Sequence, residues 1–171
     1  MATETMQTEE QYLTFLMGKD QYSIDILQVK EIIAFTDVLK IPMLPDYIKG
    51  VINLRGHVVP VLDLAMRFGK ERTQVSKLTC IIIVEVRKGD RNREVGIMVD
   101  AVNEVISLSS ENIEETPEFG EDVRADFISG MGRVDDKFII MLNVARLLNV
   151  EDMKALEIAT AQGEDIIESG E

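Results

Sequence analysis

The chain has one cysteine, one histidine and no tryptophan among its 171 residues. A single cysteine, Cys80, excludes an intramolecular disulfide. Without a second histidine or a cysteine cluster, His57 cannot build the zinc-type sites that nitrogen and sulfur ligands form. Aromatic residues are also scarce, at 5% of the chain against 46% for all apolar residues. We therefore expect a globular protein with an aliphatic core.

Motifs for catalysis are missing as well. Gly130 and Gly132 lack the lysine and helix of a phosphate-binding loop, and no serine lies in a Gly-x-Ser-x-Gly turn. Glu31 and Glu104 form a suggestive carboxylate pair, but they occupy equivalent positions of the repeat described below, which favours a structural role. We expect no enzyme, no catalytic residue, no metal, no cofactor and no small-molecule substrate. An enzyme with a carboxylate-bound metal is the alternative from another functional class.

No apolar run reaches the roughly 18 residues of a membrane span, and the N-terminus lacks the pattern of a secretory signal. The net charge is −13, concentrated at the two ends. Residues 1–10 carry three acids and no base, and residues 151–171 carry seven acids and one base, which leaves 21 acids and 17 bases between them. A near-neutral body with acidic ends disfavours nucleic acid and direct membrane insertion. We expect a cytoplasmic protein.

The sequence repeats itself. Residues 22–33 match residues 95–106 at an offset of 73, and residues 48–68 match residues 128–148 at an offset of 80, with eight identities in 33 positions. The identical pairs are Ile24/Ile97, Val29/Val102, Glu31/Glu104, Ile33/Ile106, Ile48/Ile128, Gly50/Gly130, Leu62/Leu142 and Ala65/Ala145. Chance matching of apolar residues is the alternative explanation. We interpret the pattern as two related units, roughly 11–70 and 78–150.

Each unit has the same order of predicted elements. It opens with a hairpin, whose first strand covers 12–17 in one unit and 80–86 in the other. A second hairpin follows, over 51–62 and over 128–142. Asp63 and Asn143 are good N-cap residues for short helices after these hairpins. Between the hairpins, residues 26–33 and 99–106 have helix-like spacing, although the second copy is also compatible with a buried strand.

Many short strands joined by hairpin turns indicate small β-barrels rather than a parallel sheet. Residues 151–163 can form a helix, which we expect Gly163 to end. We expect residues 1–10 to be a flexible N-terminus, and residues 151–171 to form a C-terminal helix followed by an acidic, disordered tail.

One run carries a family resemblance. The pattern Ile48-x-Gly50-x-x-Asn53-Leu54-Arg55-Gly56, continued by Pro60 and Asp63-Leu64, resembles the hallmark of the CheW family. Further matches are Tyr22 to Ile26, Val29-x-Glu31-Ile32, Val95-Gly96-Ile97-x-Val99-Asp100-x-Val102, Gly130-Met131-Gly132 and Leu142-Asn143. The likeness covers about residues 11–150, with matching spacing throughout.

The resemblance implies a mainly β fold of two intertwined SH3-like barrels, each with about five strands, plus short helices and a C-terminal helix. It implies subdomains of roughly 11–75 and 76–150, with a strand of one belonging to the other as an alternative. It also implies a non-catalytic chemotaxis adaptor. Such an adaptor binds the regulatory domain of the CheA histidine kinase and the cytoplasmic tip of a methyl-accepting chemoreceptor, and is recruited through them to receptor arrays at the membrane.

By motif, the resemblance implies a receptor-binding groove between the barrels, lined by Val29, Glu31, Gly50, Arg55, Cys80, Val95, Gly96 and Val102. Arg55 lies at a turn and could pair with Glu31. Gly50 and Gly96 could permit close backbone approach, or serve a turn with positive φ. Cys80 replaces a common aliphatic residue of the family. The kinase interface cannot be carried over by residue.

Three alternatives stay within or near this fold. The coupling domain of a CheV-like protein and the regulatory domain of a kinase share the module, but the length of the chain disfavours both. An SH3-like domain that binds nucleic acid is disfavoured by the charge.

Overall fold

The computed structural model describes residues 9–88, 91–114, 127–148 and 150–169. Residues 1–8 of the predicted flexible N-terminus and the last two residues of the predicted tail lie outside these ranges. Glu9 and Glu10 begin the first strand. No helix in the described ranges is long and apolar enough to span a membrane.

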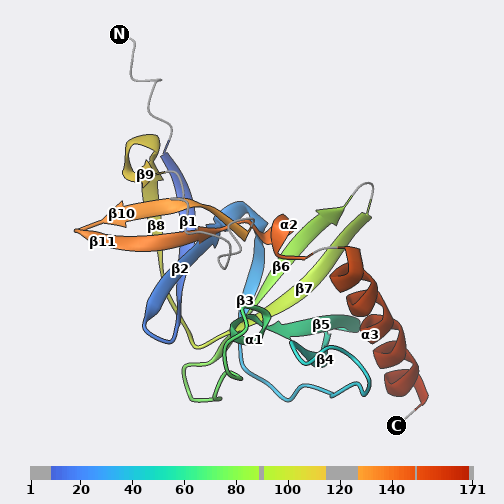
Figure 1. The fold of residues 1–171 in the computed structure, drawn as a ribbon. Coiled ribbons are helices and arrows are strands. Elements are labelled where there is room, and N and C mark those ends of the chain that lie inside the picture. Colours follow the sequence, from blue (N-terminus) through green and yellow to red (C-terminus); the bar gives the residue numbers. More distant parts are fainter. Residues whose placement is uncertain (1–8, 89–90, 115–126, 149, 170–171) are drawn as a thin grey trace.

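Eleven strands form two sheets in the described part of the chain, which we call sheet A and sheet B. Sheet A has the order β8 (Ala101–Ser109), β1 (Glu9–Met17), β2 (Asp20–Asp25), β11 (Lys137–Leu142), β10 (Ile128–Val134) and β9 (Ile113–Glu114). Sheet B has the order β3 (Val29–Ala34), β6 (Cys80–Lys88), β7 (Arg91–Val99), β5 (His57–Asp63) and β4 (Ile48–Leu54). Figure 1 shows the two sheets side by side.

Each sheet combines strands from both sequence repeats. The hairpin β1–β2 of the first repeat pairs with β8 and β11 of the second, and the hairpin β6–β7 of the second repeat pairs with β3 and β5 of the first. The two units have therefore exchanged their opening hairpins. The predicted mainly β fold of two intertwined units is confirmed.

The strand registers follow the same duplication. Val61 lies opposite Gly96 in sheet B, and Met141 lies opposite Ser23 in sheet A, at the sequence offsets of 80 and 73. The register shift between Ile48 and Gly50 recurs between residues 128 and 130. Chance matching would not reproduce paired registers and bulges, so the repeat is structural.

The helix-like spacing of residues 26–33 does not give an α-helix. Ile26–Gln28 form a 3-10 turn and the rest is strand β3, while residues 101–106 of the second copy lie in β8. A bulge between Val29 and Glu31 inserts a residue, so that Val29 packs on the main core and Ile33 on a second cluster. The bulge breaks the period-2 alternation, which made the spacing resemble that of a helix.

Short helices follow the second hairpin of each repeat, as predicted. They are α1 (Leu64–Arg67) and α2 (Val144–Leu147). The side chain of Asp63 accepts a hydrogen bond from the Ala65 N–H at 3.1 Å, and that of Asn143 accepts one from the Arg146 N–H at 3.3 Å. Both predicted N-caps are confirmed.

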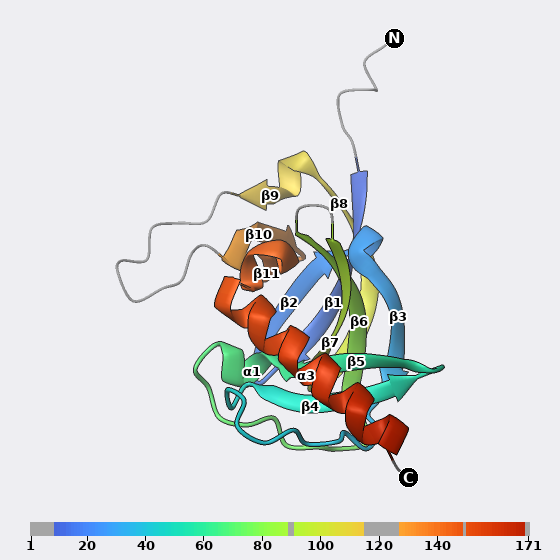
Figure 2. The same cartoon turned by 90° about the vertical axis from the view of Figure 1, so that its right-hand side faces the viewer.

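The third helix, α3 (Val150–Ser169), is longer than the sequence predicted. Gly163 does not end it, because Gly163 lies buried against strands β4 and β5. Figure 2 shows α3 lying across these strands. A Cβ atom there would lie 2.7 Å from Val51 Cγ2 and 3.0 Å from Val58 Cγ1. The glycine permits close helix–sheet packing, and the burial gained by this contact outweighs its poor helix propensity.

The main hydrophobic core draws on both sheets and all three helices. It includes Leu13 and Phe15 of sheet A, Ile82 and Val95 of sheet B, and Leu156 of α3. A second cluster fills the other face of sheet B, with Ile81, Ile83, Val61, Met98, Ile52 and Val59. The core is largely aliphatic, in agreement with the composition.

Candidate protein-binding surface

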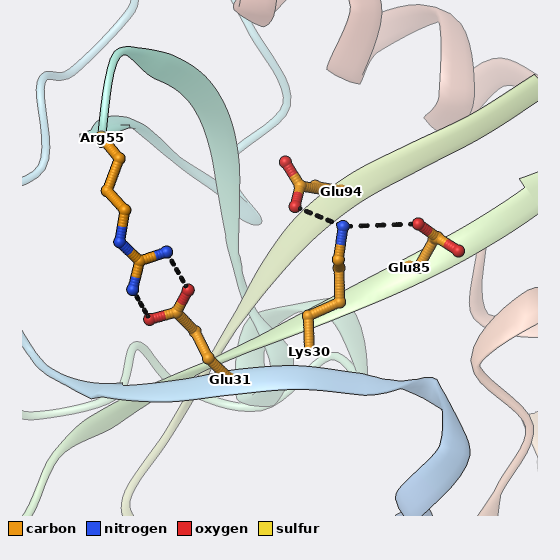
Figure 3. Close-up of polar contacts among 5 residues, drawn as sticks. All are labelled: Lys30, Glu31, Arg55, Glu85 and Glu94. Carbon is orange, nitrogen blue, oxygen red and sulfur yellow. Dashed lines mark hydrogen bonds and ion pairs between the residues drawn. The ribbon is translucent and has the colours of Figure 1, made fainter.

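An exposed ion pair joins β3, at one edge of sheet B, to the β4–β5 hairpin at the opposite edge. Arg55 lies in the β4–β5 turn with a φ of 54°, followed by Gly56 with a φ of 88°. Its Nη1 and Nη2 atoms donate to Oε1 and Oε2 of Glu31 on β3, at 2.7 and 2.8 Å (Figure 3). The hydrogen bonds and the charge of Glu31 raise the pKa of Arg55. The predicted pairing is present, in the two-pronged geometry that guanidinium and carboxylate favour.

Beside this pair, two like charges lie directly opposite one another. Glu85 of β6 is the cross-strand partner of Glu94 of β7, an arrangement that is repulsive by itself. Lys30 at the β3 bulge bridges them, with its Nζ 2.9 Å from Glu94 Oε2 and 3.5 Å from Glu85 Oε2 (Figure 3). The hydrogen bond and charge of Glu94, followed by Glu85, raise the pKa of Lys30.

The sequence analysis missed this cluster, although a signal for it existed. Glu85 and Glu94 are equally spaced about the midpoint of residues 89 and 90, within the turn predicted over 88–92, so hairpin register would have placed them opposite one another. No local feature, however, would have indicated that Lys30, from a distant strand, lies between them.

Three of the predicted groove residues lie on a single row across sheet B. Through the paired strands, the row runs Glu31, Ile83, Gly96, Val61, Gly50. Gly50 has a φ of 149°, and a Cβ atom there would lie 2.1 Å from the Leu39 carbonyl oxygen. A Cβ atom at Gly96 would lie 2.8 Å from Ile81 Cγ2. Both glycines therefore permit close approach, and Gly50 also needs the backbone freedom of glycine.

The other predicted residues lie on the side of the main core. Val29 and Val102, which are repeat equivalents, are partly buried against it, as is Cys80. The thiol of Cys80 donates to the Leu78 carbonyl oxygen at 3.3 Å. Val95 is fully buried. Its side chain can influence the shape of a groove but cannot contact a partner directly.

The outer strands of the two sheets carry further apolar side chains. Ile32 of β3 and Val105 of β8 are repeat equivalents, 41% and 46% exposed. Their cross-strand partners, Ile82 and Leu13, belong to the main core, so both point to that side of their sheets. Figure 2 shows β3 and β8 on the same side of the molecule.

We call Leu27, Val29, Ile32, Val102 and Val105 the edge surface. Glu31 points to the other face of β3, because its cross-strand partner Ile83 belongs to the second cluster. The edge strand therefore carries partly exposed aliphatic side chains on one face and the oriented guanidinium group of Arg55 on the other, and both are suited to binding another protein. Among the described residues, no group of three or more His, Cys, Asp or Glu side chains could hold a metal ion.

A family model for the CheW-like domain matches residues 11–152, most of the chain. The chain belongs to the CheW family. Membership makes it a chemotaxis coupling protein of the scaffold type.

Named CheW proteins align with nearly the whole chain. The chemotaxis protein CheW of Klebsiella aerogenes is 36% identical over 157 residues, 92% of this chain and 91% of that protein. The CheW protein of Bacillus subtilis is 34% identical over 156 residues, 90% of each chain. The crystal structure of the scaffolding protein TtCheW from Thermoanaerobacter tengcongensis superposes with a TM-score of 0.75 at 35% identity, covering 85% of this chain and 96% of that one.

Proposed function

We propose that this chain couples methyl-accepting chemoreceptors to the CheA histidine kinase without catalysing a reaction. Family membership supports the coupling role. The receptor's cytoplasmic tip, a helical hairpin, lies against the edge surface, and the Glu31–Arg55 pair orients it. A barrel of the chain contacts the regulatory domain of the kinase. The scaffold stays in the cytoplasm and reaches the membrane array only through these partners, where it raises the local concentration of kinase.

The observation that carries the receptor site is the exposed guanidinium beside the edge strand β3. The Arg55 side chain is 72% exposed, although two hydrogen bonds to Glu31 fix its orientation. A fixed and accessible donor group loses little entropy when it binds an acceptor on a partner. Val95, Gly96 and Gly50 act behind this surface by setting the shape of sheet B.

Charge reversal at Arg55 tests the site. We expect Arg55→Glu to weaken binding to a receptor cytoplasmic fragment by about tenfold or more, because it places like charges together. Binding to the isolated kinase should not change. Arg133→Glu is the matched control, because Arg133 forms a comparable exposed pair with Glu114 in sheet A, at 3.4 Å.

A second variant distinguishes the loss of the internal Glu31–Arg55 ion pair from the loss of a contact with the receptor. Exchanging the two charges, with Glu31→Arg and Arg55→Glu together, restores an internal ion pair but reverses the charge shown to the receptor. Co-sedimentation should still show weak receptor binding. Wild-type receptor binding by the folded single variant Arg55→Glu would contradict the proposed site.

A further inference from the structure

A second candidate site lies at the start of β4, where Ile48 and Lys49 line a cavity. A cavity of about 610 Å³ opens between the loop that leads into β4, helix α1 and the loop after α1. Its lining residues are Val38, Lys40, Ile41, Pro42, Met43, Leu44, Pro45, Asp46, Ile48, Lys49, Met66 and Arg72. None of the predicted receptor-groove residues is among them, although Gly50 follows Lys49 and lies against Val38. Arg55 and the residues of the edge surface do not line the cavity.

The cavity gathers positive charge in an acidic protein. Lys40, Lys49 and Arg72 line it against a single acid, Asp46. None of these three bases forms an ion pair with a described residue. In a chain with a net charge of −13, three bases around one cavity that no described acid neutralises by an ion pair create a local attraction for an acidic group.

The wall of the cavity is held in place. Leu39 and Val51 exchange two backbone hydrogen bonds of 2.8 and 2.9 Å, which fix the loop to the edge of β4. Pro42 and Pro45 restrict the backbone of the loop. Met43 between them has a φ of 66° and is fully exposed. A preformed wall with an exposed aliphatic side chain favours a ligand that carries both apolar and acidic groups.

The lining residues disfavour a nucleotide and favour an acidic aliphatic peptide. No aromatic ring is among them, so a nucleobase would find no stacking partner. Eight of the twelve lining residues are valine, isoleucine, leucine, proline or methionine, so the wall combines apolar side chains with polar groups. Carboxylates flanked by branched aliphatic side chains match this combination.

The end of α3 has this character. Glu164 and Asp165 are exposed and form no ion pair with a described residue. Ile166 and Ile167 follow, 43% and 39% exposed. The chain therefore carries two adjacent acids and two exposed isoleucines at the end of α3. Around the cavity it carries apolar side chains and three bases that form no ion pair with a described acid.

We propose that the cavity binds the acidic end of α3 from a second copy of this chain. The two surfaces differ, so the contact is heterologous and leads to rings or open chains of copies. Neither Arg55 nor the edge surface belongs to the two contacting surfaces. The contact is small and strongly electrostatic, so it is weak and sensitive to salt.

Sedimentation velocity of two charge-reversed variants and their mixture tests this. The cavity variant is Lys40→Glu with Lys49→Glu, and the helix variant is Glu164→Lys with Asp165→Lys. Wild-type chain should associate as its concentration rises at low ionic strength and should dissociate in high salt. The cavity variant alone should stay monomeric because acid meets acid, and the helix variant alone because base meets base.

The equimolar mixture gives the decisive result. In each mixed pair, either both surfaces are native or both are reversed, so association should return. Lys19→Glu with Lys137→Glu, an equal change of charge outside the cavity, should associate like wild type. Monomeric wild-type chain at all concentrations in low salt would overturn the proposal, as would association of the single variants or a mixture that stays monomeric. Circular dichroism establishes that each variant is folded.

Discussion

Sheets A and B are built from the same repeat, but they carry charge very differently. Sheet B contains Lys30 between Glu85 and Glu94. The equivalent positions of sheet A are Asn103, Leu16 and Gln21, and Leu16 and Gln21 are paired across β1 and β2 as Glu85 and Glu94 are across β6 and β7. The backbone pattern is therefore common to both copies, and the charged side chains belong to one.

The ion pair at the hairpin turn shows the same difference. Arg55 corresponds to Asp135, and both adopt positive φ, at 54° and 48°. Glu31 corresponds to Glu104, which has no arginine at the equivalent turn to pair with. Arg55 of the hairpin turn therefore pairs with Glu31 of the edge strand β3, whereas among the described residues Glu104 of the equivalent strand β8 forms no ion pair. The duplication supplied two similar edges, and one of them carries the charge pair that we propose orients a receptor.

Helices α1 and α2 extend the comparison into the core. Arg67 of α1 corresponds to Leu147 of α2, and both are buried. The Arg67 guanidinium lies over the rings of Tyr47 and Phe127, themselves repeat equivalents, with centroid distances of 5.4 and 4.8 Å. It donates to Asp152 of α3 at 2.9 Å, and the Tyr47 hydroxyl donates to the same carboxylate. One buried ion pair thus joins α3 to both repeats.

Breaking this ion pair should have the largest effect. Asp152→Ala leaves a buried guanidinium without its counter-charge, and we expect it to lower the free energy of unfolding by about 3–5 kcal/mol. Replacing both partners, with Arg67→Leu as in α2 and Asp152→Leu, should recover much of that loss. Urea unfolding measures both, with Lys154→Ala on the exposed side of α3 as control. A single variant within about 1 kcal/mol of wild type would show that the pair does not hold α3.

Substitutions at Gly50 and Gly130, the glycines at the equivalent bulges of the two repeats, should have the second largest effect on stability. We expect Gly50→Ala to cost about 3 kcal/mol, because the new Cβ meets the Leu39 carbonyl at 2.1 Å and the φ of 149° is strained. At the equivalent Gly130 the nearest atom is Ile113 Cγ2 at 3.1 Å, so Gly130→Ala should cost about 1 kcal/mol. Equal losses in thermal or urea unfolding would mean that the edge of β4 relaxes freely.

The repeat and its hairpins could be predicted from the sequence, because turn residues and alternating apolar residues are local signals. The N-caps Asp63 and Asn143 were predictable for the same reason. Gly163 was misjudged because a glycine that ends a helix and one that packs against a sheet look alike until the packed partner, Val51, is known. Burial against distant residues overrode the local preference.

The candidate site was partly predictable. The Glu31–Arg55 pair followed from the family motif, and the structure places the two side chains together. The exchange of hairpins could not be derived from the repeat, because either pairing of equivalent strands satisfies the same sequence pattern. Without knowledge of that exchange, the sequence could not place Lys30 beside Glu94. It also could not show that Ile32 and Val105 lie on the edge strands β3 and β8.

Replacing Lys30 of sheet B by asparagine, the residue at the equivalent position 103 of sheet A, should have a smaller effect on stability, and this effect should depend on salt. We expect Lys30→Asn to lower the thermal midpoint at low ionic strength, because Glu85 and Glu94 then repel across the strands. Added salt should recover part of the loss, as should Glu94→Gln, which copies Gln21. A midpoint of Lys30→Asn equal to that of wild type at low ionic strength would mean that the carboxylates of Glu85 and Glu94 are each solvated and do not repel one another measurably.

The smallest effect at neutral pH concerns Tyr12 of sheet A, which stands where sheet B has the buried Ile81. Burial, with the hydrogen bond and charge of Glu10, raises the pKa of Tyr12 from 10.0 to about 12. Below pH 10 the phenol keeps its proton in both the folded and the unfolded chain. Between pH 10 and about 12 the unfolded chain loses it first, so the free energy of unfolding falls as pH rises.

Tyr12→Phe should remove this part of the alkaline loss. The difference in the free energy of unfolding between wild type and variant should be constant up to about pH 9, and should then shift in favour of the variant toward pH 12. Urea unfolding across this range measures the difference, and the tyrosinate absorbance of wild type and variant identifies the group. A difference that stays constant through pH 12 would mean that Tyr12 ionises as easily in the folded chain as in the unfolded one.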